Sequence, residues 1–246
     1  MTMPSLLLVP GAWHKPEHLQ LLIDEMPDID VHTVALTSCG DDPKSLGDMY
    51  SDAAAIKAAV EAIDGPVVVV AHSYGGVPVT QALVGTANVE SIVYLAAFQL
   101  DAGDSLLSSV GGNSAPWWQL HRTEGVGDYM TVAGPVGVFY GDVDPAIAEK
   151  AAAELGYQSY AAITQELTAV AWQTIPSTYI ICEADNAIPP FAQELFAQRA
   201  RKTLRLNASH SPFLSQPSTL AQLLRDELTS AEDPRPSLNG GQRKAA

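Results

Sequence analysis

The sequence predicts an α/β fold in which a mostly parallel sheet carries helices on both faces. Short apolar runs alternate with helical patterns over residues 5–98 and again over residues 177–228. Four consecutive valines at residues 67–70 are typical of a central strand that is buried on both faces. At 246 residues, of which 47% are apolar, the chain is long enough for one such domain with an insertion.

The expected elements follow one another in βα order. Strands are predicted at residues 5–9, 31–36, 67–72 and 91–98, with helices at 16–26, 43–63 and 77–84. After an interruption, strands are predicted at residues 177–183 and 203–207, and helices at 190–200 and 217–228. Pro16 and Pro190 suit the first position of a helix, where a missing N–H is tolerated. Strands that alternate with helices in this way favour a parallel sheet.

Residues 100–172 interrupt this alternation. They contain no strong strand run, but they hold three of the four tryptophans and short helical patterns at 145–155 and 163–170. We therefore expect residues 1–99 and 173–230 to form the core and residues 100–172 to form an inserted helical cap. The alternative is that these helices cover the sheet as a second face of the core. Residues 231–246 are rich in proline, glycine and charge, which predicts a disordered tail.

Charge and cysteine content exclude several functions. Lys and Arg number 13 against 28 Asp and Glu, a net charge of −15 that disfavours nucleic acid and anionic membranes as partners. Cys39 and Cys182 form neither a disulfide framework nor a metal-binding spacing, and Cys182 lies in an apolar run that suggests burial. The sequence shows no signal-peptide pattern and no apolar stretch long enough to span a membrane. These features predict a soluble, cytoplasmic protein.

The valine run ends in Ala-His-Ser-Tyr-Gly-Gly, at residues 71–76, immediately before a helical segment. A strand, a sharp turn carrying a serine, and a helix together make the context of a nucleophile elbow. Ala71 and Gly75, two residues before and after Ser73, are small, as the close approach of the two backbones requires. The alternative is an ordinary βα turn rich in serine and glycine. Ser73 is the candidate nucleophile.

A serine nucleophile needs a base and an acid that orients the base. In this context the acid and then the histidine follow the serine along the chain, in loops beyond the carboxyl ends of strands. Asp185 and His210 occupy such loops in that order. Glu183 is the alternative acid, but it belongs to the predicted strand, so Asp185 is favoured. His72 precedes the serine and is interpreted as a packed or hydrogen-bonded core histidine.

The oxyanion hole is expected to consist of two backbone N–H groups. One belongs to Tyr74, directly after the nucleophile, and the other to Ala12, in the loop after the first strand. His14 and His18 are four residues apart, a spacing that can bind metal on a helix, but no third ligand is evident. No glycine-rich phosphate loop is present either. The sequence therefore predicts no metal and no cofactor.

Six segments carry a resemblance to a known family. They are LLLVPGAWH at residues 6–14, AHSYGG at 71–76, YLAAFQLDAGDS at 94–105, FYGDVDP at 139–145, IPSTYIICEADNAIPP at 175–190 and ASHSPFLSQP at 208–217. Over residues 4–230 the chain resembles the α/β-hydrolase superfamily, and within it the small bacterial esterases related to plant methylesterases and hydroxynitrile lyases. The resemblance implies that Ser73, His210 and Asp185 are nucleophile, base and acid, with Ala12 and Tyr74 as the oxyanion hole. Many relatives have His-Gly where this chain has Pro10 and Gly11.

The expected activity is that of a cofactor-free carboxylesterase-type serine hydrolase that acts on small-molecule esters of modest size through an acyl-enzyme. Four aromatic residues are expected to line its pocket: Trp13, Trp117, Trp118 and Tyr140. A lyase or C–C bond hydrolase using the same triad is one alternative, and a ligand-binding receptor with a vestigial site is another. The sequence is compatible with a homodimer but does not decide the oligomeric state.

Overall fold

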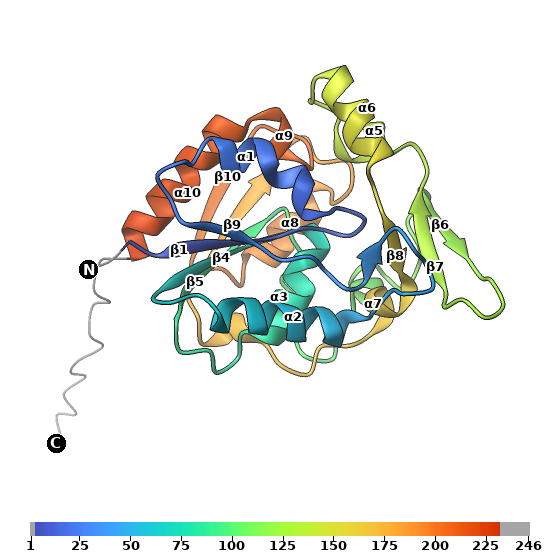
Figure 1. Ribbon diagram of the computed structural model, residues 1–246, viewed down its shortest axis with the longest axis horizontal. Coiled ribbons are helices and arrows are strands. Elements are labelled where there is room, and N and C mark those ends of the chain that lie inside the picture. The colour runs from blue at the N-terminus through green and yellow to red at the C-terminus, as the bar shows by residue number, and fades with distance from the viewer. Residues whose placement is uncertain (1–2, 232–246) are drawn as a thin grey trace, which may run out of the picture.

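The computed structural model describes residues 3–231 and is organised around a six-stranded parallel sheet (Figure 1). The strands lie in the order β10-β9-β5-β4-β1-β2. Their bounds are β1 Ser5–Val9, β2 Val31–Thr33, β4 Val67–His72, β5 Val89–Leu95, β9 Ser177–Cys182 and β10 Lys202–Leu206. The predicted α/β class is therefore confirmed.

Strand β4 lies inside the sheet because its side chains are apolar on both faces. It pairs in parallel with β1, where Leu8 lies opposite Val70, and with β5, where Val93 lies opposite the same valine. All six residues of β4 and all five of β1 are buried. Burial of both faces is the environment that the valine run predicted, and it fixes the position of the turn that follows His72.

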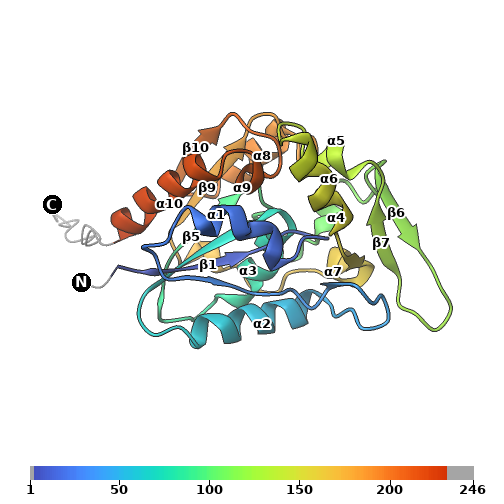
Figure 2. The same ribbon diagram turned by 45° about the horizontal axis from the view of Figure 1, so that its top comes forward.

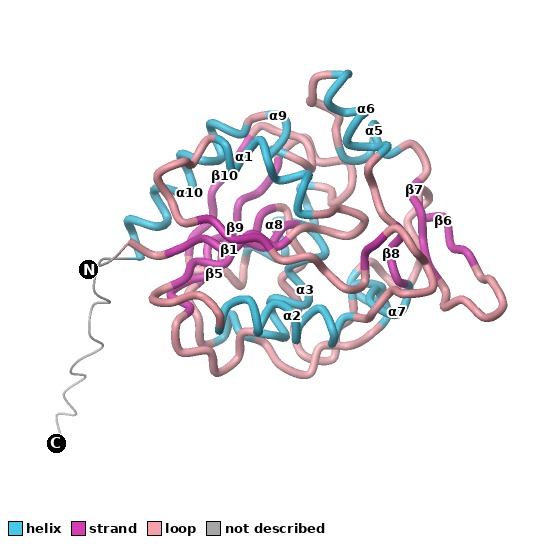
Figure 3. The backbone as a smooth tube through the Cα atoms, viewed as in Figure 1, coloured by secondary structure: helices cyan, strands magenta, loops and turns pink. Residues whose placement is uncertain are grey.

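Helices cover both faces of the sheet, as Figure 3 shows. On one face lie η1 Pro16–Leu19, α1 Gln20–Asp24, α9 Pro212–Ser215 and α10 Pro217–Ala231, and on the other lie α2 Met49–Glu61 and α3 Gly76–Ala82. Helix α8, Pro190–Ala197, packs beside β9. Helix α2 begins later than the predicted residue 43, because the Asp48 side chain accepts a hydrogen bond from the Ser51 N–H and caps the helix there.

The inserted segment contains strands as well as the expected helices. Its elements are α4 Leu106–Ser109, β6 Trp118–His121, β7 Tyr129–Val132, α5 Pro135–Phe139, α6 Pro145–Ala153, β8 Tyr157–Ser159, α7 Tyr160–Thr164 and η3 Ala171–Gln173. The three strands join β3, Cys39–Gly40, in a second sheet of order β3-β8-β7-β6. Figures 1 and 2 both place β6, β7 and α5 at the same end of the molecule. The segment is thus a mixed αβ insertion, and its second sheet includes a strand, Cys39–Gly40, that comes well before it in the sequence.

Two further expectations concern the ends of the chain and the membrane. Residue 231 ends α10, and the rest of the predicted tail, 232–246, lies outside the described residues. Within residues 3–231, no helix combines the length and the apolar character needed to cross a bilayer. Cys182 is fully buried and Cys39 is half-buried, and neither forms a disulfide.

Candidate active site

Ser73 lies where β4 turns into helix. It begins the short 3-10 turn η2, Ser73–Gly75, which leads directly into α3. Its φ of 54° is in the left-handed region, which is strained for a residue with a Cβ. A Cβ on Gly75 would lie 2.5 Å from the Pro10 carbonyl oxygen, so this position requires glycine. The predicted strand–serine–helix turn is present, with the strain and the close backbone approach of a nucleophile elbow.

The loop after β1 lies directly against Ser73. A Cβ on Gly11 would meet the Ser73 Cβ at 2.7 Å and the His72 Nδ1 at 2.9 Å. Neither atom belongs to the far end of a flexible side chain, so a larger residue here would push the loop away from the serine. The absence of a side chain at residue 11 therefore allows the loop to approach Ser73.

His210 and Asp185 form a buried pair beyond the carboxyl ends of β10 and β9. The His210 Nδ1 lies 2.7 Å from the Asp185 Oδ2, and the two residues are 1% and 4% exposed. An ionised carboxylate only accepts hydrogen bonds, so the proton sits on Nδ1 and Nε2 is left free as a base. Within residues 3–231, the Ser73 hydroxyl has no hydrogen-bond partner. The fold thus gathers the three predicted residues at one edge of the sheet without joining Ser73 to His210 by a hydrogen bond.

Further hydrogen bonds fix the Asp185 carboxylate. Its Oδ1 accepts from the backbone N–H groups of Ala187, at 2.7 Å, and Ile188, at 2.9 Å. Its Oδ2 also accepts from the Gln193 Nε2, at 2.9 Å. Glu183, the alternative acid, is exposed and lies 3.5 Å from the Arg205 guanidinium. The structure therefore brings Asp185, and not Glu183, to the histidine, and it adds Gln193 as a supporting residue that sequence reasoning missed.

His72 supports the backbone of His210. Its Nε2 donates a hydrogen bond to the His210 carbonyl oxygen at 2.9 Å, and the two rings lie 4.6 Å apart. Burial, followed by the proximity of His210, lowers the pKa of His72 well below 6.5, so the ring is neutral. The interpretation of His72 as a hydrogen-bonded core histidine is confirmed. Its contact with His210 had no signal in the sequence, because the two residues are 138 positions apart.

Ala12 and Tyr74 border the same cavity as Ser73. No acceptor within the described chain bonds to the Ala12 N–H. Tyr74 is the second residue of η2, a position whose N–H has no partner inside the turn. The neighbouring Trp13 N–H is occupied, because it donates to the Gln158 Oε1 at 3.1 Å. These two residues thus offer backbone N–H groups beside the cavity that contains Ser73, and their role as an oxyanion hole stays a prediction.

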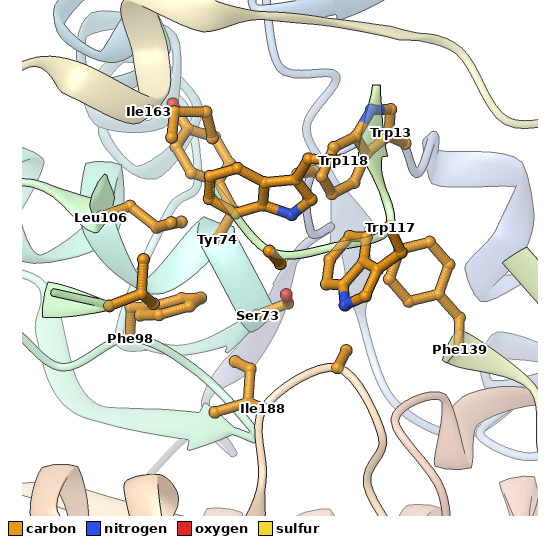
Figure 4. Close-up of a pocket in the computed structure, with 14 residues that line it drawn as sticks. Trp13, Ser73, Tyr74, Phe98, Leu106, Trp117, Trp118, Phe139, Ile163 and Ile188 are labelled. Atoms are coloured by element: carbon orange, nitrogen blue, oxygen red, sulfur yellow. The ribbon is translucent and has the colours of Figure 1, made fainter. Parts of the chain in front are cut away.

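A narrow, mostly apolar cavity of about 50 Å³ opens above Ser73 (Figure 4). Trp13, Trp117 and Trp118 line it, as predicted, and the Ser73 hydroxyl points into its centre. The other lining residues are Ala12, Tyr74, Phe98, Leu106, Val110, Ala115, Phe139, Ile163, Ala187 and Ile188. Most of the wall opposite the serine comes from the inserted segment. No Lys or Arg of the described chain is among the lining residues.

The Trp118 Nε1 is an unusual polar atom in this cavity. It is buried, and no atom within residues 3–231 accepts its hydrogen bond. Figure 4 shows the nitrogen facing the space above Ser73. An unpaired buried donor costs free energy that a ligand acceptor can recover. The cavity therefore offers a bound molecule one hydrogen-bond donor in addition to those near Ser73.

Tyr140 lies outside the cavity lining, in contrast to its predicted place. Its hydroxyl donates to the His14 Nε2 at 2.9 Å, and the His14 Nδ1 donates to the Ala12 carbonyl oxygen at 2.9 Å. Burial lowers the pKa of His14 well below 6.5. Tyr140 and His14 therefore connect the inserted segment to the loop that carries Ala12. The Nε2 of His18 bonds to the Ala151 carbonyl oxygen instead, and no cluster of metal-ligating side chains occurs within residues 3–231.

Comparison with known proteins agrees with this fold. Residues 6–223 match the model of the alpha/beta hydrolase family. The alpha/beta hydrolase nvfD of Aspergillus novofumigatus is 29% identical over 92% of this chain and 97% of its own length. A probable hydrolase, R7, of a Phoma species is 31% identical over 92% of this chain and 98% of its own length. The structure of a methylesterase from Arabidopsis superposes with a TM-score of 0.77 at 20% identity, covering 92% of this chain and 99% of that one.

Proposed function

The chain belongs to the alpha/beta hydrolase family, and we propose that it is a serine esterase that cleaves carboxylic esters of modest size through an acyl-enzyme. The observation that carries the proposal is the buried His210–Asp185 pair, with its 2.7 Å hydrogen bond, at the same sheet edge as the strained Ser73. A histidine with a purely structural role would not require a serine in a left-handed turn at the floor of an apolar cavity. A serine hydrolase requires the histidine–aspartate pair, the serine and the cavity together.

Acylation begins when the Ser73 Oγ attacks the acyl carbon of the ester. The His210 Nε2 takes the hydroxyl proton, and Asp185 stabilises the imidazolium that results. The Ser73–His210 hydrogen bond forms in this step, since such bonds in unliganded sites are often long and tighten only with substrate. The Ala12 and Tyr74 N–H groups hold the negative charge that develops on the carbonyl oxygen.

The ester bond then breaks. The departing alkoxide receives the proton from the His210 Nε2 and leaves as the alcohol, while the acyl group remains on Ser73. A water molecule gives a proton to the same nitrogen and attacks the acyl carbon. Collapse of the second tetrahedral intermediate returns the proton to Ser73 and releases the acid. The reaction needs no metal or cofactor.

The cavity suggests the kind of ester that fits. Its walls are aliphatic and aromatic, so an apolar acyl or alcohol group gains free energy by leaving water there. The small volume of this cavity, about 50 Å³, limits the substrate to a small molecule. The Trp118 N–H favours an ester with a second acceptor oxygen, such as a keto or alkoxy group. A panel of p-nitrophenyl and methyl esters of increasing chain length measures this preference.

The experiment that tests the proposal is Ser73→Ala with a fluorophosphonate probe. The wild-type protein is expected to be labelled on Ser73 and to hydrolyse p-nitrophenyl butyrate. The variant is expected not to be labelled, and its kcat is expected to fall by a factor on the order of 10⁴. An unlabelled wild-type protein without turnover, but with bound ligand, would instead favour the receptor alternative.

A second assay separates the esterase from a hydroxynitrile lyase. Cyanide leaves as an anion and needs a nearby cation, which resembling lyases supply as a lysine directly after the catalytic histidine. This chain has Ser211 there, and no Lys or Arg of residues 3–231 lines the cavity. Those lyases also use a threonine at the position of Gly11, where a Cβ would lie 2.7 Å from the Ser73 Cβ. We expect ester hydrolysis without benzaldehyde release from mandelonitrile, and the opposite pattern would overturn the proposal.

A further inference from the structure

We propose that Asp52 is a positioning residue that holds both backbone donors of the oxyanion hole in place, an inference that rests on the proposed esterase function. Asp52 lies in helix α2, away from the cavity, and is completely buried. A chain of hydrogen bonds leads from its carboxylate to the residue after the nucleophile. A second chain leads to the loop after β1. The two chains end at the two segments that carry the proposed donors.

The Asp52 carboxylate accepts four hydrogen bonds. Its Oδ1 accepts from the Thr37 hydroxyl at 2.8 Å and from the Ser38 N–H at 2.9 Å. Its Oδ2 accepts from the Ser38 hydroxyl at 2.5 Å and from the Tyr74 hydroxyl at 2.7 Å. Four donors fill the acceptor sites of a carboxylate, and within residues 3–231 no cation pairs with it. Burial raises the pKa of Asp52, and the hydrogen bonds oppose that shift.

The first chain of hydrogen bonds is direct. Tyr74 follows the nucleophile, and its N–H is one of the two proposed oxyanion donors. Its ring is fully buried, and its hydroxyl reaches the Asp52 Oδ2. The bond ties the side chain of Tyr74 to helix α2. Because the ring is rigid, the hydrogen bond at its hydroxyl also restricts the peptide between Ser73 and Tyr74.

The second chain passes through two side chains. The Ser38 hydroxyl, which donates to Asp52, accepts a hydrogen bond from the Gln158 Nε2 at 2.8 Å. The Gln158 Oε1 accepts from the Trp13 N–H at 3.1 Å. Trp13 has a φ of 63°, a strained conformation for a residue with a side chain. Gln158 thus stabilises the turn immediately after Ala12, and Asp52 orients Gln158 through Ser38.

Two physical arguments point to geometry as the purpose of this arrangement. A buried carboxylate without a cation is costly compared with an apolar side chain at the same place on a helix, so packing alone does not explain it. A negative charge also repels an oxyanion, so Asp52 does not stabilise the transition state by its field. Its benefit is the fixed direction of the two N–H groups, which must be aimed before the charge develops.

The test is Asp52→Asn, with Glu227→Gln as the matched control. The asparagine side chain places an NH₂ group where one carboxylate oxygen was. At the position of the Asp52 Oδ2, this donor faces the hydroxyl groups of Ser38 and Tyr74. Glu227 is also a buried carboxylate, bonded to Thr178 at 2.6 Å and to Lys202 at 2.6 Å, but in a network that does not reach the cavity. Both changes weaken a buried network, and only the first is expected to disturb the oxyanion hole.

The measurements separate positioning from stability. For each folded variant, kcat and KM are measured with p-nitrophenyl butyrate, and active sites are counted by fluorophosphonate titration. Inhibition is compared for an alkyl trifluoromethyl ketone, which forms an oxyanion adduct with the serine, and for its methyl ketone analogue, a weak ligand that remains a ketone. We expect Asp52→Asn to lower kcat per active site by about tenfold or more and to raise the trifluoromethyl ketone Ki by the same factor. KM and the methyl ketone Ki are expected to stay within about threefold, since neither requires the aimed N–H groups.

A second variant keeps the inference testable if Asp52→Asn does not fold. Tyr74→Phe removes one hydroxyl, keeps the backbone N–H, and leaves Asp52 with three donors. It should show the same pattern with a smaller loss of kcat. A variant that loses thermal stability but retains kcat and the ratio of the two inhibition constants would overturn the inference. An inactive, unlabelled wild-type protein would instead overturn the proposed function itself.

Discussion

Asp185→Asn tests the candidate active site at the atom that orients the histidine. Asparagine fits the space of aspartate, and its Oδ1 can keep the bonds from Ala187 and Ile188, which are 2.7 and 2.9 Å long. Its Nδ2 then replaces Oδ2. That amide faces two groups that are now donors, the Gln193 Nε2 at 2.9 Å and the His210 Nδ1 at 2.7 Å.

The expected loss of kcat follows from these donors facing one another without an acceptor. His210 can resolve it by moving its proton to Nε2, so that Nδ1 accepts from the amide. The Nε2 that should take the Ser73 proton is then occupied, and the imidazolium has no carboxylate beside it. The equivalent change in serine proteases lowers kcat by about 10⁴, or roughly 5.5 kcal/mol of transition-state free energy. The bond from Gln193 is also lost, so we expect the free energy of unfolding to fall by about 1–3 kcal/mol.

The assay measures kcat and KM for p-nitrophenyl butyrate, together with urea unfolding to confirm that the variant is folded. Glu183→Gln is the control, because Glu183 is exposed and its pairing with Arg205, at 3.5 Å, contributes little. We expect the control to remain within about twofold of the wild type. A folded Asp185→Asn protein with nearly normal kcat, or a greater loss in the control, would refute the assignment of the acid.

Two further predictions concern stability. Burial, the largest cause, lowers the pKa values of His14 and His72 below 6.5, so the unfolded chain binds protons that the folded chain does not, and stability is lost as the pH falls below 6.5. Between pH 7.5 and pH 5.5, each histidine should lower the free energy of unfolding measured in urea by up to about 1.4 kcal/mol in total, and a His14→Gln variant that loses as much stability as the wild type would contradict this. Gly75→Ala places a Cβ 2.5 Å from the Pro10 carbonyl oxygen, so unfolding should become easier by about 1–3 kcal/mol or more. Gly137→Ala, which meets open space, serves as its control, and equal stability of the two variants would argue against the close packing of the turn.

Sequence reasoning succeeded where one local pattern determines the outcome. The strands Ser5–Val9 and Val67–His72 were predicted to the residue, because both are apolar runs that a proline or glycine bounds. The pairing of Asp185 with His210 followed from a rule about position, namely that loops beyond the carboxyl ends of parallel strands meet at one edge. Neither prediction required knowledge of distant contacts.

The strands of the insertion could not be predicted in the same way. Trp118–His121 and Tyr129–Val132 have four residues each, and Tyr157–Ser159 has three. Segments this short, interrupted by polar residues, have no clear period of two. Their stability comes from pairing with one another and with Cys39–Gly40, a partner that only the folded chain identifies.

The burial of Asp52 could have been predicted from its position in the helix. It lies three residues after Met49 and four before Ile56, so it falls on the apolar side of its helix. A carboxylate at such a position is buried and needs donors, which is a reason to search for a network. The identity of those donors, Ser38 and Tyr74 among them, remains inaccessible from spacing alone.

The contacts of Trp13 show that the inserted segment holds the loop after β1 as well as covering the cavity. Three groups from the insertion hold this one residue: the Gln158 Oε1 bonds to its N–H at 3.1 Å, the Gly156 N–H bonds to its carbonyl oxygen at 2.9 Å, and the Met130 carbonyl oxygen bonds to its indole N–H at 3.0 Å. Trp13 is strained and directly follows Ala12. A core without the insertion would retain the loop after β1 but would lose every one of these bonds. In the proposed mechanism, exchanging the insertion to alter substrate preference must therefore preserve these three groups, because the segment that shapes the pocket also holds the loop of the Ala12 donor.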